Sequence, residues 1–136
     1  METIRTVYPG ELRTQATHTV SGYQLITDVP KEHGGRGESF SPTDLFCASL
    51  VSSMLSVMGG ITRNPAFGGN IDGTFARTTK IMKESPHMVA EIIVEFDMPK
   101  NNFTSEQKKM LETAANSSQV AKSLNDGLKQ TLIFNY

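Results

Sequence analysis

The sequence lacks several features that define common protein classes. It has no tryptophan and one cysteine, Cys47, which excludes an intramolecular disulfide and any all-cysteine metal cage within one chain. The three histidines belong to no ligand-spaced motif, so we expect no metal and no cofactor. The N-terminal stretch is charged at Glu2, Arg5 and Glu11 and contains no apolar, signal-like segment. These absences indicate a cytoplasmic protein.

The chain also has no large excess of positive or of negative charge. The formal net charge is -1 and the sequence pI is near 6.3. No run of lysine and arginine is present that would attract nucleic acid or an anionic membrane surface. We therefore expect neither nucleic acid nor a membrane as a partner.

The longest nearly uncharged run extends from Ser41 to about Met58 and predicts a long helix. Ser41 can act as its N-cap, a proline suits the first helical position, and Asp44 can reach back to the free N–H groups. Apolar residues cover almost every side, which predicts a helix surrounded by other structure. The glycines at 59–60 can end it. Because hydroxyl side chains interrupt the run, we do not interpret it as a membrane span.

The remaining elements follow from alternation and turn signals. We expect strands at 4–8, 12–19, 23–27, 71–82, 88–98 and from 128 to 136, a polar loop at 29–40, and helices at 104–115 and 119–124. This order predicts a single α+β domain over residues 1–136, with a long central helix packed against a mainly antiparallel sheet.

Residue patterns alone leave the chemistry open. Cys47 has apolar neighbours, which favours an inert buried thiol, but a position in the first two helical turns could assist a redox nucleophile. The serines at 52 and 53 lie in no GxSxG motif and have no histidine tied to them, so helix packing is the default interpretation.

Three segments carry a resemblance to a known family. TDVPKEHGGRGESFSPTDLFCASLVSSML, RTTKIMKESPHMVAEIIVEFDMP and ETAANSSQVAKSL, in this order, resemble the OsmC/Ohr family of peroxide and osmotic-stress proteins over nearly the whole chain. The resemblance implies an intertwined homodimer in which sheets from both subunits wrap long central helices, with two active sites at the subunit interface.

The resemblance also places the two cysteines of the active members. The peroxidatic segment, similar to LGSCML, falls on LVSSML, and the resolving segment, similar to NTCPVAKSL, falls on NSSQVAKSL. Ser53 and Ser118 therefore occupy the two cysteine positions, and Gln119 replaces the usual proline. A serine hydroxyl can neither form a sulfenic acid nor condense to a disulfide.

Other positions of the implied site differ as well. Where the reductases carry a glutamate after the helix-start proline, this chain has Thr43, followed by Asp44. The activating arginine of the reductases has two candidates here, Arg13 and Arg36. We expect Thr43, Asp44 and Arg36 to contribute to a ligand site, with the choice between the two arginines open.

These features predict a cytoplasmic homodimer related to organic hydroperoxide reductases that lacks thiol peroxidase activity and binds a small apolar or peroxidic molecule at the dimer interface. An alternative is an active stress-response peroxidase that uses Cys47 as a one-cysteine nucleophile. A hydrolase built on Ser53 is a third hypothesis, although no base is placed for it.

Overall fold

The computed structural model describes residues 1–136, and the chain falls into two compact units, Met1–Phe46 and Cys47–Tyr136. The expectation of a single domain over residues 1–136 stays a prediction.

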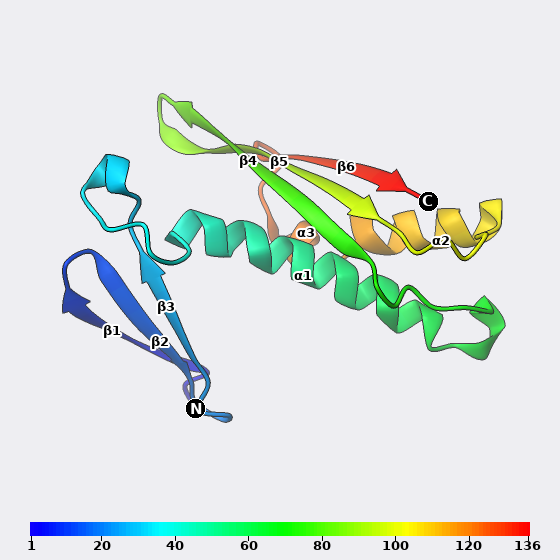
Figure 1. The fold of residues 1–136 in the computed structure, drawn as a ribbon, viewed down its shortest axis with the longest axis horizontal. Helices are drawn as coiled ribbons and strands as arrows, with labels where there is room; N and C mark the ends of the chain where they lie inside the picture. Colours follow the sequence, from blue (N-terminus) through cyan, green and yellow to red (C-terminus); the bar gives the residue numbers. More distant parts are fainter. The chain divides into compact units, whose positions relative to one another are not determined.

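The first unit is built on a three-stranded antiparallel sheet (Figure 1). Its strands are β1 (Ile4–Gly10), β2 (Arg13–His18) and β3 (Gln24–Asp28), and they pair in sequence order. The turn between β1 and β2 needs positive φ angles, which Gly10 supplies easily and which Glu11 and Leu12 also adopt. The three strands expected from the sequence are confirmed.

The segment after β3 contains more structure than the sequence indicated. We expected residues 29–40 to be loop throughout, but Lys31–His33 form the short 3-10 helix η1. Gly34 ends it with a positive φ of 96° and donates its N–H to the carbonyl of Lys31. A glycine in the left-handed conformation is the usual end of such a turn, and this accounts for the extra helix.

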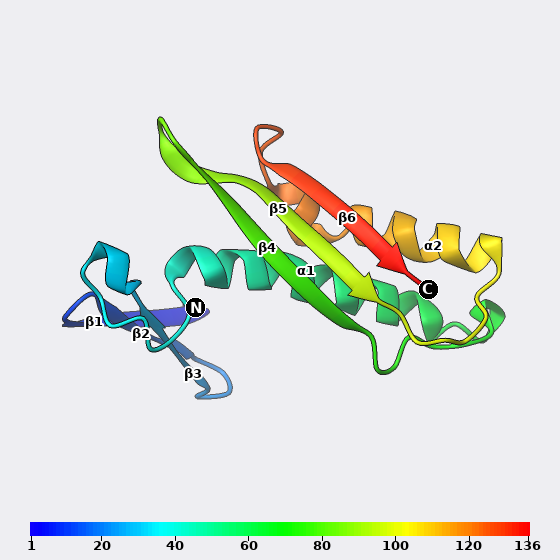
Figure 2. The same ribbon diagram turned by 45° about the horizontal axis from the view of Figure 1, so that its top comes forward.

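The second unit contains a second three-stranded sheet with the order β4-β5-β6. Strands β4 (Phe75–Glu84) and β5 (His87–Asp97) are antiparallel, whereas β5 and β6 (Lys129–Asn135) are parallel. Figures 1 and 2 show this sheet on one side of a layer that contains the long helix and α2. The elements outside the sheet are α1 (Pro42–Thr62, from Cys47 onward in this unit), the 3-10 helix η2 (Pro65–Phe67), α2 (Ser105–Asn116) and α3 (Gln119–Ser123).

Alternation along β5 creates the core of this second unit. Ile92, Val94 and Phe96 are fully buried, and Phe96 stacks on Phe134 of β6 with ring centroids 5.0 Å apart. The helices add further side chains with no exposed surface: Leu50, Met54, Met58 and Leu111. The strand predicted at 88–98 is confirmed as β5.

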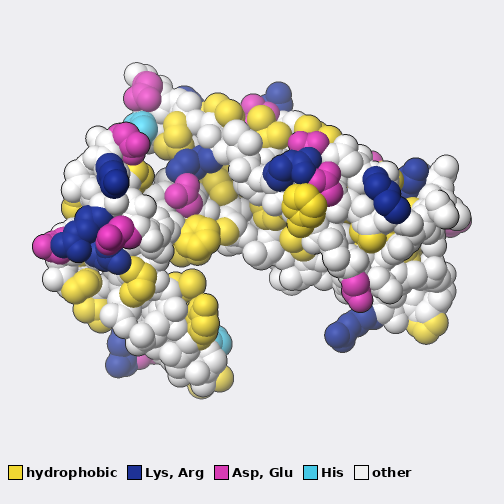
Figure 3. Space-filling view, viewed as in Figure 1, with side chains coloured by type: hydrophobic (Ala, Val, Ile, Leu, Met, Phe, Trp, Pro, Cys, Tyr) yellow, Lys and Arg dark blue, Asp and Glu magenta, His cyan; other side chains and the backbone are white.

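The opposite face of the same sheet carries neutralised charge. Arg77 of β4 pairs with Glu95, with 2.9 Å between Nη2 and Oε2, and also with Asp97, while Asn135 donates to both carboxylates. Figure 3 shows positive and negative side chains side by side on one face of the molecule.

The two largest differences from the predicted boundaries are at the end of α1 and at the start of β4. α1 continues through the glycines at 59–60 to Thr62, whose hydroxyl donates to the carbonyl of Gly59 at 2.7 Å. A glycine in a helix costs only about 1 kcal/mol relative to alanine, so two glycines do not force an end. β4 begins at Phe75 rather than at Ile71, because the N–H of Thr74 donates to the carbonyl of Ile71 and closes a turn.

By length and composition alone, α1 could cross a membrane, a property that core helices of soluble proteins share. Only 28% of its most apolar 18-residue window is buried within this chain. The exposed positions on this helix include Ser49, Ser52 and Ser56. A helix surface that carries hydroxyl side chains is more typical of contact with protein than of contact with lipid.

Candidate functional site

Ser53 lies midway along α1 and is half-buried. Its Oγ accepts a hydrogen bond from the backbone N–H of Val120, with 3.4 Å between N and Oγ. Val120 is the second residue of α3, so the contact joins two helices that are 67 positions apart in the chain. Ser53 therefore lies beside the start of α3.

Ser118 also lies at the start of α3. It is the N-cap residue of α3, has no exposed surface, and accepts the N–H of Ala121 on its Oγ at 3.3 Å. The turn before it is held by the N–H of Ser118 on the carbonyl of Ala115. Ser53 and Ser118 thus accept hydrogen bonds from successive N–H groups, those of Val120 and Ala121.

Cys47 is 4% exposed and lies in the same helix as Ser53. The two positions are six residues apart, which at ~100° per residue and 1.5 Å rise corresponds to about 240° of rotation and about 9 Å along the axis. The thiol therefore points to a different side of α1. It is not an alternative occupant of the Ser53 position.

An apolar groove of about 550 Å³ runs between α1 and α2 in the second unit. Val57, Ile61, Met110 and Ala114 provide its apolar surface, and Glu106, Lys109, Thr113 and Ser117 provide the polar part. Val57 is one helical turn after Ser53, and Ser117 directly precedes Ser118. The lining residues of the groove are thus close to the two serines in the sequence, although neither serine lines it.

The start of α1 belongs to the first unit and is fixed by a reciprocal cap. The N–H of Asp44 donates to Ser41 Oγ, and the N–H of Ser41 donates to Asp44 Oδ2, both at 3.0 Å. Ser41 Oγ also lies 3.2 Å from the hydroxyl of Thr43. This capping box confirms the helix start predicted from the sequence.

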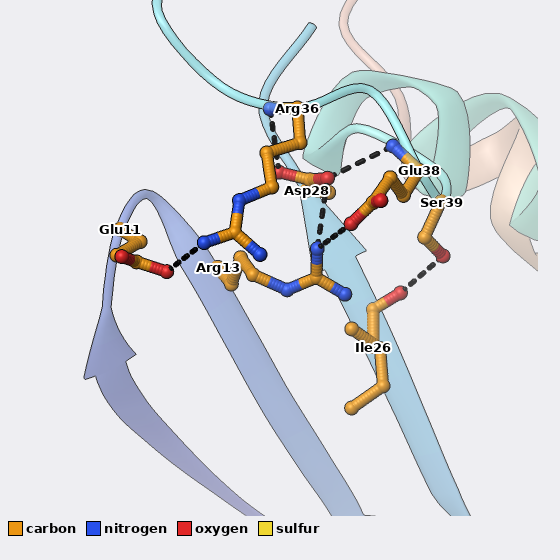
Figure 4. Close-up of polar contacts among 7 residues, drawn as sticks. All are labelled: Glu11, Arg13, Ile26, Asp28, Arg36, Glu38 and Ser39. Atoms are coloured by element: carbon orange, nitrogen blue, oxygen red, sulfur yellow. Dashed lines mark hydrogen bonds and ion pairs between the residues drawn. The ribbon is translucent and has the colours of Figure 1, made fainter.

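A second polar cluster in the first unit surrounds the buried carboxylate of Asp28 (Figure 4). Asp28 accepts the backbone N–H groups of Glu38 at 2.8 Å and Arg36 at 3.3 Å, and pairs with Arg13 at 3.1 Å. The same guanidinium contacts Glu38 at 2.7 Å, whereas the Arg36 guanidinium pairs with Glu11. Asp28 thereby ties the loop before α1 to the sheet.

Hydrogen bonding sets the ionisation of this carboxylate. The N–H of Glu38 is the largest of the influences that hold the pKa of Asp28 below its usual value of 3.8, and the N–H of Arg36 and the charge of Arg13 act in the same direction. Burial opposes them and does not prevail. Asp28 is therefore a structural anion at neutral pH.

Comparisons with known proteins bear on the family. No family model matches the sequence, and no curated protein matches it. A solved structure from Psychrobacter arcticus 273-4, described as a candidate osmotic stress induced and detoxification response protein, is 36% identical, with a TM-score of 0.93 over 99% of this chain and 96% of that one. The chain belongs to the OsmC/Ohr family.

More distant OsmC/Ohr structures share the fold. An organic hydroperoxide resistance protein OsmC from Legionella pneumophila is 13% identical with a TM-score of 0.76, covering 100% of this chain and 98% of that one. The organic hydroperoxide resistance protein OhrB of Bacillus subtilis is 13% identical with a TM-score of 0.67, covering 98% of each chain. The α+β fold with a long central helix is thus confirmed.

The predicted OsmC/Ohr site residues divide between the two units. Ser53 and Ser118 meet in the second unit, at the N–H groups of Val120 and Ala121. Thr43, Asp44, Arg13 and Arg36 belong to the first unit, where each has local partners. The choice between Arg13 and Arg36 stays open, and the ligand role predicted for Thr43, Asp44 and Arg36 stays a prediction.

Sequence reasoning missed the residues that organise these contacts. Asp28 ends a strand beside a glycine-rich loop, a position where a carboxylate often collects backbone N–H groups, and this signal could have identified it. The groove carried no comparable signal, because apolar residues such as Met110 and Ala114 in a predicted helix say nothing about what fills the space beside that helix.

Proposed function

We propose that this OsmC/Ohr protein has no thiol peroxidase activity and binds a small apolar or peroxidic molecule beside Ser53 and Ser118. The observation that supports this most directly is the meeting of these two serines at the start of α3. The resemblance places the reacting thiols of the reductases at these two positions. Here both positions hold hydroxyls.

Peroxide reduction by thiols requires a thiolate that attacks the peroxide oxygen, followed by condensation of the sulfenic acid with a second thiol. Ser53 and Ser118 can perform neither step. The alternative nucleophile, Cys47, is 4% exposed and points away from the Ser53 side of α1. Reactive cysteines are normally accessible and close to a cation, so burial argues against this alternative.

The groove between α1 and α2 supports the binding part of the proposal. Its volume of about 550 Å³ and its mixture of apolar surface with a few polar groups are typical of small-molecule sites. The hydroxyl group of Thr113 at its edge can donate to an oxygen of a ligand, whereas the Ser117 hydroxyl donates to the carbonyl of Ala114. An apolar molecule with one oxygen-bearing end fits this chemistry.

We further propose a homodimer, in a reducing cytoplasmic setting. Much of α1 is exposed in a single chain, and β1 and β3 also expose large apolar side chains such as Ile4, Val7 and Leu25. Surfaces of this kind on one chain favour coverage by a second copy. The small exposed residues Ser52 and Ser56 allow another helix to approach closely.

Activity is tested with the purified protein, a dithiol reductant and cumene hydroperoxide. We expect consumption of the hydroperoxide to equal that of a boiled control. Turnover that disappears in the variant Cys47→Ala would overturn the proposal and establish the one-cysteine peroxidase. Labelling of Ser53 by a serine-directed activity probe would instead establish the hydrolase.

Ligand binding is tested by calorimetry with cumene hydroperoxide and, separately, with the alcohol formed by its reduction. Met110→Arg places a charge in the groove and should weaken binding at least roughly tenfold, because a charged group next to a bound apolar molecule is poorly solvated. Met88→Arg is the matched control, since Met88 is 40% exposed and Met110 is 43% exposed. No binding by the wild-type protein, or equal binding by both variants, would contradict the proposed groove.

A further inference from the structure

The start of α3 is the place where two distant parts of the second unit are held together. With five residues, α3 is too short to be stable by its own hydrogen bonds. The first N–H groups of any helix have no partner within the helix and need one from elsewhere. At α3, two of these groups find serine hydroxyls.

The two hydroxyls come from different elements. Ser118 is the N-cap and accepts the N–H of Ala121, which is the usual capping contact. Ser53 projects from α1 and accepts the N–H of Val120, which an N-cap residue alone leaves without a partner. α3 is therefore capped partly by its own chain and partly by a neighbouring helix.

Further contacts hold the other side of α3. Gln130 of β6 donates from Nε2 to the carbonyl of Ala121 at 3.2 Å, and Ala121 is buried. Ser118 has no exposed surface, so a lost hydroxyl could not be replaced by water without rearrangement. α3 is thus fixed between α1 and β6 by hydrogen bonds at two sides.

We propose that Ser53 and Ser118 form a two-hydroxyl clamp that fixes α3 on α1 in a single arrangement that oxidants do not change. A hydroxyl is a good hydrogen-bond acceptor and is inert to peroxide, whereas a thiol accepts hydrogen bonds weakly and is oxidised in steps. The clamp gives both serines a structural role that does not depend on ligand binding. It therefore stands or falls separately from the proposed function.

Amide hydrogen exchange of Val120 and Ala121 tests the clamp. Loss of one hydrogen bond should speed exchange roughly fivefold at the residue concerned, so Ser53→Ala should act at Val120 and Ser118→Ala at Ala121. Ser53→Thr keeps the hydroxyl and should restore protection at Val120. Ser52→Ala, at an exposed neighbouring position of α1, is the matched control and should leave both amides unchanged.

Ser53 is only half-buried, so Ser53→Ala remains informative even if Ser118→Ala fails to fold. Equal exchange at Val120 in Ser53→Ala and Ser52→Ala would overturn the clamp. A peroxide challenge provides the second measurement: the wild-type protein should keep its protection at Val120, and Ser53→Cys should lose it as the thiol is oxidised. Equal losses in both proteins would also overturn the proposal.

Discussion

The interiors of the two units are stabilised by different interactions. In the second unit, Cys47–Tyr136, apolar side chains from α1, α2 and the sheet have no exposed surface, whereas the first unit, Met1–Phe46, buries no apolar side chain at all. Its buried residues are polar: Thr27, Asp28 and Ser41. Burial of apolar surface is the main driving force of folding, and the first unit has hydrogen bonds and ion pairs in place of a buried apolar core.

This contrast bears on the proposed function. The two serines and the groove lie in the unit with its own core, where their geometry is fixed by packing. The residues expected to supply charge to the site lie in the first unit, which has no apolar core of its own. We infer that the second unit preserves the position of the family's reacting groups, and that the first unit is the part that most needs a second copy of the chain.

The largest expected effect is loss of the core of the second unit. Phe96→Ala removes a fully buried ring that stacks on Phe134 and should lower the free energy of unfolding by about 3–5 kcal/mol. Phe40→Ala in the first unit removes a ring that is 53% exposed and should change it by less than about 1 kcal/mol in dilute solution. Urea unfolding measures both, and equal costs would remove the contrast between the units.

The second prediction tests whether a second copy of the chain covers the exposed apolar side chains of the first unit. If a second copy covers it, dilution should increase amide exchange in β1–β3 before it increases exchange in β4–β6. Ser52→Trp blocks close approach of a partner helix and should weaken dimerisation at least roughly tenfold, or about 1.4 kcal/mol. Ser123→Trp, at an exposed position of α3, is the control.

Analytical ultracentrifugation reads out both variants. A wild-type protein that stays monomeric at all concentrations, with fully protected strands β1–β3, would show that the first unit is stable without a partner. Equal weakening by Ser123→Trp would show that the effect of Ser52→Trp is not specific to α1.

Much of the fold followed from local signals in the sequence. The cap of α1 at Ser41, the helix after Thr104 and the strand β5 each reflect local sequence patterns, and the cap and both elements were predicted. The parallel pairing of β5 with β6 was not, because pairing partners are set by the tertiary fold. The extension of α1 past its two glycines was missed because packing outweighs a weak local propensity.

The candidate site was predictable only in part. Ser53 and Ser118 were found through the resemblance, and the sequence could not show that both hydroxyls serve α3, because that contact joins positions 53 and 120. The ion pair of Arg13 with the buried Asp28 likewise depends on the register of β2 against β3, where the two residues are direct partners.

The third prediction tests the polar interior of the first unit. Because hydrogen bonds hold the pKa of Asp28 below 3.8, the stabilisation by its carboxylate is complete above that pH and is lost as the pH falls through the lower, folded-state pKa. Amides of Arg36 and Glu38 should therefore lose exchange protection under acid before those of β5. Asp28→Asn keeps one acceptor oxygen and loses the other, so it should release at least one of these two amides at neutral pH, whereas exposed Asp126→Asn should release neither. Unchanged amides in Asp28→Asn would show that the loop is held by other contacts.

The smallest effects are expected at two helix caps, one in each unit. Thr104→Ala removes the cap of α2 and should cost about 1 kcal/mol of global stability, because α2 contributes Leu111 to the core. Ser41→Ala removes the matching cap of α1. The first turn of α1 lies in the first unit, which has no buried apolar side chain. This turn should therefore fray with little change in the free energy of global unfolding. Urea unfolding combined with exchange at Asp44 separates the two responses. If Ser41→Ala lowered the free energy of global unfolding as much as Thr104→Ala does, the first unit would unfold together with the second. The two units would then differ in their burial of apolar side chains but not in their stability.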